Sequence, residues 1–246
     1  MSDVQRVFIT GGASGLGRAL ALQYARAGWA VAIADVHDGR GAETLKELNE
    51  LTTQAGTIFA PRYFHADVTI EAELQAVADA LEADWQGIDV LYNNAGVAQA
   101  GAIEDVPLSD WEWIVNINLL GVVRGCKIFT PGFKRQGSGH IVNIASMAGL
   151  LDVPRMASYN VTKAAVVALS GTLTHELMDA GIGVSVVCPS FFPTNLEDTM
   201  RTTDAGLKKM MNKLLASGKL SADEVAERII DREKKDQQHI LPHESG

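Results

Sequence analysis

The feature of this sequence that most restricts its fold is a series of short segments in which nearly every residue is apolar. In Val31-Ala32-Ile33-Ala34, for example, polar and apolar positions do not alternate. A strand of this kind must be covered on both faces, which is typical of a parallel sheet. We predict six such strands, at Val4–Thr10, Trp29–Asp35, Arg62–Asp67, Ile88–Asn93, His140–Ser146 and Gly183–Cys188.

The segments between these strands have the spacing of amphipathic helices. Apolar residues recur every three or four positions at Leu74, Val77, Ala78 and Leu81, and again at Leu207, Met210, Met211, Leu214 and Leu215. Strands that alternate with helices predict an α/β fold, here a doubly wound parallel sheet (Rossmann fold) with helices on both faces. We expect residues 1–246 to form a single domain, in which 191–220 hold a substrate loop and a lid helix.

Composition limits the classes of partner. The chain has a formal net charge of −9, which repels the phosphates of nucleic acids and of anionic lipids, so we expect neither nucleic acid nor membrane as a partner. No apolar run approaches the roughly 20 residues that span a bilayer, and the first residues lack the pattern of a secretory signal. Cys126 and Cys188 suit a reducing compartment as buried thiols, so we expect a cytoplasmic protein.

The segment Ser158–Leu173 differs from the other predicted helices because it is small or apolar around most of its circumference. Such a helix is expected to be buried on more than one side. Its second side would contact another subunit, in a homodimer or homotetramer, or it would be the central core helix of a monomer.

A glycine-rich turn follows the first strand, with Gly11, Ser14, Gly15, Leu16 and Gly17 as its predicted cofactor-binding residues. Glycines allow a tight turn and let backbone N–H groups approach a pyrophosphate at the start of the next helix. The alternative is a purely structural turn. The position between the first strand and the first helix favours dinucleotide binding.

Asp35 ends the second strand, eighteen residues after Gly17. An acidic residue at this distance accepts hydrogen bonds from the adenosine ribose hydroxyls and repels a 2′-phosphate, so it favours NAD over NADP. His37 and Arg40 are nearby cations that would weaken this preference. A strand-end cap or turn residue is the alternative interpretation of Asp35.

Three residues form a candidate catalytic group. Tyr159 and Lys163 are four residues apart and share a face of their helix, so the ammonium is expected near the phenol. There, together with the positive charge of an oxidised nicotinamide, it would lower the phenol pKa. Tyr159 would then act as general acid or base on an alcohol or ketone. Ser146, after the fifth strand, would hydrogen-bond the substrate oxygen. Taken singly, each residue has a structural interpretation, as a chance pair or a strand cap.

In order and spacing, these motifs resemble those of the short-chain dehydrogenase/reductase family over about residues 4–195. The resemblance rests on Thr10–Gly17, Asp67-Val68, Asn93–Gly96, Asn118, Ser146, Tyr159 and Lys163. It implies that Asp67 and Val68 flank the adenine of the cofactor, and that Asn94, Ala95 and Gly96 close over it.

The resemblance also implies a proton relay. Asn118 resembles the family's helix asparagine, which holds a water that joins Lys163 to solvent, and Asn116 is a competing candidate. Lys163 would also hold the nicotinamide ribose hydroxyls.

Two segments near the C-terminus depart from the family pattern. Pro189, Phe192 and Thr194 resemble the loop at the nicotinamide carboxamide, but Ser190 stands where the family has glycine. The family's final strand often carries a Gly-Gly pair that is absent here, which leaves that strand an open question. We interpret His239 and His243 as part of a solvated tail and expect no metal site.

The loops after strands four to six supply the predicted substrate contacts, which are mostly apolar: Ser146, Met147, Val153, Met156, Tyr159 and Phe191. The helix Gly206–Ala216, with Met210 and Met211, would close over the site as a lid, or its apolar stripe would only pack the helix onto the body of the protein. The sequence therefore predicts an oxidoreductase that transfers a hydride between NAD(H) and a secondary alcohol or ketone of apolar or aromatic character. The alternative is a catalytically silent dinucleotide-binding sensor or interaction protein.

Overall fold

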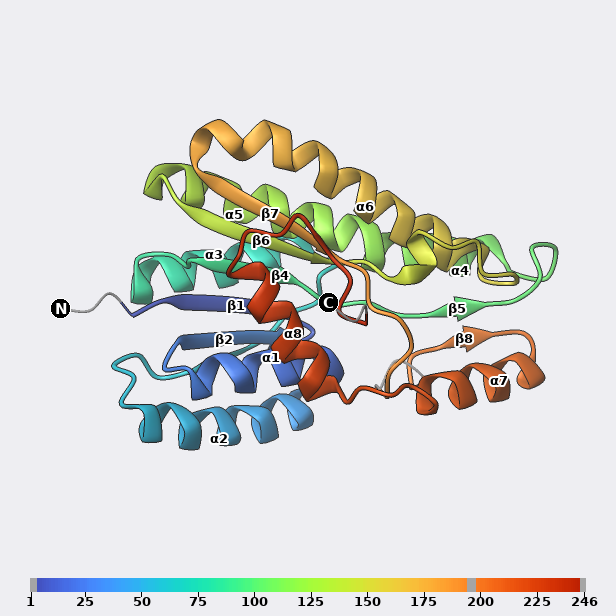
Figure 1. The fold of residues 1–246 in the computed structure, drawn as a ribbon, viewed down its shortest axis with the longest axis horizontal. Coiled ribbons are helices and arrows are strands. Elements are labelled where there is room, and N and C mark those ends of the chain that lie inside the picture. The colour runs from blue at the N-terminus through green and yellow to red at the C-terminus, as the bar shows by residue number, and fades with distance from the viewer. Residues whose placement is uncertain (1–3, 194–197, 244–246) are drawn as a thin grey trace.

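The computed structural model describes residues 4–193 and 198–243. Seven strands form its main sheet: β1 (Arg6–Thr10), β2 (Ala30–Asp35), β3 (Arg62–His65), β4 (Val90–Asn93), β6 (Gly139–Ile144), β7 (Ile182–Val187) and β9 (His239–Ile240). Their order across the sheet is β3-β2-β1-β4-β6-β7-β9, and each neighbouring pair is parallel (Figure 1).

Helices cover both faces of this sheet. On one face lie α1 (Gly15–Arg26), α2 (Asp38–Ala55) and α8 (Ala222–Glu233), and on the other α3 (Glu71–Trp85), α5 (Gly121–Gln136) and α6 (Ala157–Leu177) (Figure 1). Successive side chains of a strand point to opposite faces, so Val7 and Ile9 join the core beneath α1, whereas Phe8 packs on Phe129 of α5. The predicted doubly wound Rossmann fold is confirmed.

Several predicted strands extend too far at their carboxyl ends. Asp67, Ser146 and Cys188 lie just beyond β3, β6 and β7. Apolar composition continues past these points because the chain remains buried after it leaves the sheet. Since Asp67, Ser146 and Cys188 follow the last residues of parallel strands, they lie at the carboxyl edge of the sheet.

The C-terminus does form a final strand. In β9, His239 pairs with Val186 and Ile240 with Val187, and Ile240 is fully buried. Backbone hydrogen bonds to β7 and one buried apolar side chain are sufficient for this pairing, so the absence of a Gly-Gly pair does not prevent it.

A smaller layer extends beyond the carboxyl edge. It consists of β5 (Gln99–Ala100), which pairs with β8 (Arg201–Thr202), and of α4 (Leu108–Val115) and α7 (Ala205–Ala216). Between α4 and α5 the helix passes through a π-helical turn, η1 (Asn116–Leu120), and short 3₁₀ turns occur at η2 (Met147–Gly149) and η3 (Met178–Ala180). In α7, Asp204 caps the first turn through hydrogen bonds from Gly206 N and Leu207 N.

Helix α6 is not enclosed by its own chain. Its buried face includes Tyr159, Lys163 and Val166, whereas Val161 and Ala168 are exposed on the opposite side. The interpretation of α6 as the central core helix of a monomer is therefore wrong. Among the described helices, none combines the length and apolar character needed to cross a membrane.

Candidate active site

A cavity of about 840 Å³ opens at the carboxyl edge of the sheet. It brings together most of the predicted site residues, from segments that are far apart in the sequence. Those lining it are Gly11, Ser14, Gly15, Leu16, Asp35, Asp67, Val68, Asn94, Ala95, Gly96, Ser146, Met147, Val153, Met156, Tyr159, Lys163, Pro189, Phe191 and Phe192. Gly17 and Asn118 are not among the lining residues, and Thr194 lies outside the described part of the chain.

The glycine-rich turn packs against the end of β4. Gly11 has φ +64°, and a Cβ at this position would lie 2.8 Å from Ala95 Cα, so a side chain has no room there. A Cβ on Gly17 would collide with the carbonyl oxygen of Gly11. Gly17 therefore supports the cavity wall by allowing α1 to begin close against the turn.

Side chains of neighbouring segments hold the turn in place. The Asn94 amide donates to the carbonyls of Thr10 (2.9 Å) and Gly11 (3.1 Å), and Thr10 Oγ1 accepts from the backbone N–H groups of Asn94 and Ala95. Ser14, the residue before α1, makes no side-chain cap. The first-turn N–H groups of α1 thus border the cavity at the positive end of the helix dipole.

Asp35 braces this turn and also lines the cavity. Its Oδ2 accepts a hydrogen bond from Ala13 N, and its Oδ1 accepts one from His37 N, each at 3.1 Å. It is thus a turn residue whose carboxylate also faces a cavity. Arg40, one of the predicted neighbouring cations, pairs with Asp198 at 2.9 Å.

Asp67 and Val68 line the same end of the cavity, where the chain leaves β3. Asp67 Oδ1 accepts from Thr69 N at 2.8 Å, while its own N–H donates to Glu73 at 2.7 Å. These bonds fix the turn into α3. Val68 packs against Gly121, where a Cβ would lie 2.9 Å from Val68 Cγ2.

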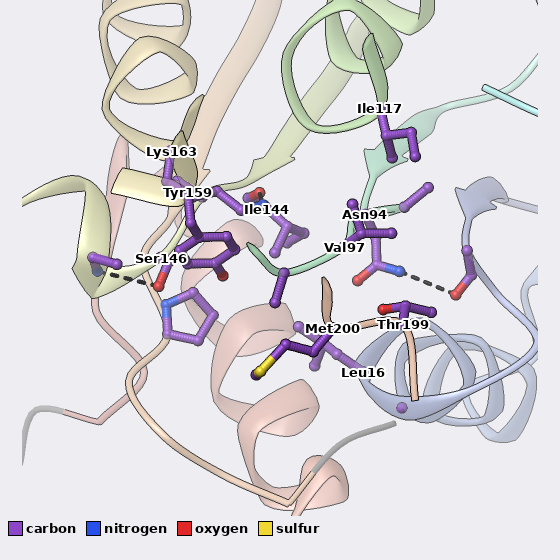
Figure 2. A pocket seen from close by; sticks show the side chains of 18 of the residues that line it. Leu16, Asn94, Val97, Ile117, Ile144, Ser146, Tyr159, Lys163, Thr199 and Met200 are labelled. Carbon is purple, nitrogen blue, oxygen red and sulfur yellow. Dashed lines mark hydrogen bonds between the residues drawn. The ribbon is translucent and has the colours of Figure 1, made fainter. Parts of the chain in front are cut away.

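Ser146, Tyr159 and Lys163 lie together on one side of the cavity, opposite Leu16 and Asn94 (Figure 2). Ser146 Oγ accepts from Ala148 N at 3.1 Å, which directs the hydroxyl proton toward another acceptor. Burial raises the pKa of the Tyr159 phenol, and a hydrogen bond with the Ser146 side chain opposes this rise. Burial is thus the larger of these two effects on the phenol pKa, and the predicted lowering, which includes the positive charge of a bound oxidised nicotinamide, stays a prediction.

Lys163 is buried beside the tyrosine. Its Nζ donates to Ile144 O at 2.9 Å and lies 5.8 Å from the centroid of the Tyr159 ring. Burial lowers the pKa of Lys163 to about 8, and the Cys188 thiol has a smaller opposing effect. An ammonium this poorly solvated is stabilised by any negative charge that develops nearby.

The two asparagine candidates of η1, Asn118 and Asn116, have different surroundings in the structure. Asn118 is fully buried, accepts from Val97 N at 2.8 Å and donates to Val97 O at 2.9 Å. Its amide also reaches Thr162 on α6. Asn116 instead receives a hydrogen bond from Arg124 at 2.7 Å. Asn118 thus joins η1 to the cavity wall next to α6, whereas Asn116 does not.

The segment after β7 forms another wall. Pro189 O accepts from Met147 N at 2.9 Å, and Ser190 N donates to His243 Nδ1 at 3.1 Å. The His243 ring lies 5.8 Å from that of Phe192, and His243 lines the cavity. The interpretation of His243 as part of a solvated tail is therefore wrong. No sequence signal links it to Ser190, which is 53 residues away.

The cavity wall also includes apolar residues that could not be identified from the sequence. Ile117 and Trp113 belong to this group. The guanidinium of Arg201 lies 3.9 Å above the Trp113 ring, so this tryptophan both packs and lines the cavity. In α7, Met211 and Leu215 face the cavity, but Met210 is 51% exposed, contrary to its predicted place on the buried face.

Charged groups are sparse on this apolar side. Arg155, which is not among the lining residues, pairs with Asp204 at 3.2 Å. Within residues 4–193 and 198–243, no group of three or more His, Cys, Asp or Glu side chains is placed to hold a metal ion.

Comparisons with known proteins agree with this architecture. Residues 5–205 match the family model described as short chain dehydrogenase. The probable oxidoreductase EphD of Mycobacterium tuberculosis is 33% identical over 238 residues, which is 93% of this chain; the chain spans 39% of the length of that relative.

Two solved structures are also similar over nearly the whole chain. A short-chain dehydrogenase/reductase from Burkholderia phymatum in complex with NAD has a TM-score of 0.91 and 35% identity, covering 98% of this chain and 89% of that one. A short-chain dehydrogenase from Sphingobium yanoikuyae in complex with NADPH has a TM-score of 0.83 and 28% identity, covering 98% and 88%. The chain belongs to the short-chain dehydrogenase/reductase family of oxidoreductases.

Proposed function

We propose that this protein transfers a hydride between NAD(H) and a secondary alcohol or ketone of apolar or aromatic character. The observation that carries the proposal is the meeting of Ser146, Tyr159 and Lys163 in the cavity that the glycine-rich turn also borders (Figure 2).

The cavity residues fit a nicotinamide dinucleotide. The missing side chain at Gly11 and the N-terminus of α1 leave room and backbone donors for a pyrophosphate. Asp67 and Val68 would flank the adenine, and Asn94, Ala95 and Gly96 would lie over the cofactor. The loop residues Pro189 and Phe192, with Thr194, would meet its carboxamide.

Asp35 supports NAD as the preferred dinucleotide. Its carboxylate lines the cavity and would accept hydrogen bonds from a ribose, but it would repel a 2′-phosphate. Arg40, one of the two nearby cations that would weaken this preference, pairs with Asp198.

When bound, the nicotinamide supplies the carbon that accepts or releases the hydride. Tyr159 would take the proton of the alcohol hydroxyl at its phenol oxygen, or return it to a ketone in the reverse direction. Because burial raises the pKa of this phenol, it needs positive charge nearby to act at neutral pH, and Lys163 provides an ammonium. Ser146 would donate a hydrogen bond to the substrate oxygen.

Two further predicted roles support the catalytic group. Lys163 would also hold the nicotinamide ribose hydroxyls, and Asn118 would hold the water that links Lys163 to solvent. Asn118 is hydrogen-bonded to Val97 of the cavity wall and to Thr162 of α6, which supports this assignment.

The apolar wall supports the substrate class. Met147, Val153, Met156 and Phe191 line the cavity near the candidate catalytic group. Burial of a substrate's apolar surface there would be favourable by about 25 cal/mol per Å². We also infer that 191–220 act as a substrate loop and lid, since Met211 and Leu215 of α7 contribute to the same wall.

The exposed face of α6 supports a homodimer or homotetramer. Val161 is 53% exposed, and Ala168 lies on the same open side. Small and apolar side chains at these positions would let a second subunit pack closely on α6.

A screen of apolar secondary alcohols with NAD, followed by NADH absorbance, tests the proposal. We expect turnover of at least one such alcohol. A protein that binds NADH tightly but turns over none of the screened alcohols, or of the corresponding ketones in reverse, would favour the dinucleotide-binding sensor instead.

A further inference from the structure

The C-terminal segment is fixed against the sheet up to His243. Cys188 N donates to Ile240 O at 2.9 Å, extending the contact between β7 and β9. Two arginines of α8 hold the following carbonyls: Arg232 donates to Leu241 O, and Arg228 donates to Pro242 O at 3.0 Å. His243 is therefore presented to the cavity by a segment held from two sides.

The contact of His243 with Ser190 defines the tautomer of the imidazole. Nδ1 accepts the Ser190 N–H, so the proton of the neutral ring resides on Nε2. Burial, together with the charge of Arg228, lowers the pKa of His243, which favours this neutral form. Nε2 itself is buried and has no hydrogen-bond partner among the described residues.

The segment that His243 contacts is a wall of the cavity, and few other polar contacts with residues 4–193 and 198–243 hold it. Pro189 is held through its carbonyl by Met147 N. On the far side, Gly218 lets the backbone of Phe191 and Phe192 pass very close, since a Cβ on Gly218 would lie 2.5 Å from Phe192 Cα. Between these points, the imidazole is the group that fixes the Ser190 amide.

We propose that His243 is a positioning residue, which holds Ser190–Phe192 in the conformation that receives the nicotinamide end of the dinucleotide. This inference rests on the proposed function, because the wall has this role only if the cavity binds NAD(H). Residue 243 would then act through the loop.

The test uses substitutions that separate the two ring nitrogens. In His243→Asn the side-chain oxygen replaces Nδ1 as acceptor, whereas in His243→Gln the corresponding oxygen lies near the position of Nε2. His243→Ala removes both. His239→Ala is the matched control, because His239 lies on the same segment with an exposed side chain.

Two measurements are made on the full chain. In the absence of cofactor, hydrogen exchange followed by mass spectrometry measures the exchange rate of the backbone amides in the peptide that contains Ser190. Fluorescence titration gives the Kd for NADH. For His243→Ala and His243→Gln we expect faster exchange in that peptide and a Kd raised about three- to tenfold. His243→Asn should restore both values, and His239→Ala should leave both as in the wild type.

The outcomes distinguish this inference from the function on which it rests. If the wild type binds NADH and the alanine and glutamine variants bind it equally well, His243 has no positioning role, even if the variants melt at lower temperature. Equal effects of asparagine and glutamine would also overturn the inference. A wild type that binds neither NADH nor NADPH would overturn the proposed function and this inference with it.

Discussion

Glu233 ends helix α8 inside the protein, with only 5% of its surface exposed. Its Oε2 accepts a hydrogen bond from the Tyr24 phenol at 3.1 Å, and Tyr24 in turn contacts the Tyr92 phenol at 3.0 Å. His140 Nδ1 lies 3.9 Å from Glu233 Oε1 and 3.5 Å from Asp236. Burial raises the pKa of Glu233 from 4.5 to about 7.

We predict that Glu233→Gln stabilises the protein at alkaline pH. A raised pKa means that the folded state favours the protonated acid, so this stabilisation is complete below pH 4.5 and is lost as the pH rises to about 7. Linkage gives a cost of ionisation of about 0.8 kcal/mol at pH 5 and about 3.3 kcal/mol at pH 8. Because glutamine does not ionise and can still accept from Tyr24, the free energy of unfolding of the variant relative to wild type should increase by about 2.5 kcal/mol from pH 5 to pH 8.

Urea unfolding at both pH values, at equal protein concentrations, measures this difference. His140 titrates in both proteins, so its own contribution largely cancels. Glu227→Gln is the control, because Glu227 is an exposed carboxylate on the same helix. A relative stability that is the same at pH 5 and pH 8 would refute the reasoning, since it would mean that Glu233 is ionised in the folded protein at both values.

Three further predictions concern the proposed function. Tyr159→Phe should lower kcat about 10²–10⁴-fold while the Kd for NADH from fluorescence titration stays the same; retained turnover would remove Tyr159 from the mechanism. Asp35→Ala should lower the ratio of kcat/KM for NAD to that for NADP, measured by absorbance, and a wild type that already prefers NADP would contradict the cofactor assignment. Ala168→Glu should shift the mass measured by light scattering to that of the monomer, and a wild type that is monomeric at micromolar concentration would defeat the oligomer proposal.

The sheet could be predicted because its signal is local. Continuous apolarity in Val31–Ala34 requires cover on both faces, and that requirement holds whatever the rest of the chain does. The glycine-rich turn is similar, because its position between a strand and a helix is contained in eight residues, Thr10–Gly17. Such features specify both the architecture and one edge of the cavity.

What could not be predicted depends on contacts between distant segments. His243 reaches Ser190 only after β9 has paired with β7. The pKa of Tyr159 is set by the burial of its phenol, which a helical spacing of four residues does not encode. Met210 has the spacing of a buried residue but faces solvent, because α7 covers only a cavity and not a full core face.

The π-helical turn η1 limits the changes in length that the chain tolerates between α4 and α5. A π turn contains one residue more than the α-helix would need, and an α-helix advances about 100° for each residue. Deleting a single residue from Asn116–Leu120 would let α4 and α5 join as one regular helix that keeps the faces of both, while side chains within the segment would shift around the helix axis by up to about that angle. Asn118 would then turn away from Val97, so we expect this segment to tolerate a substitution at an exposed position better than a change in its length.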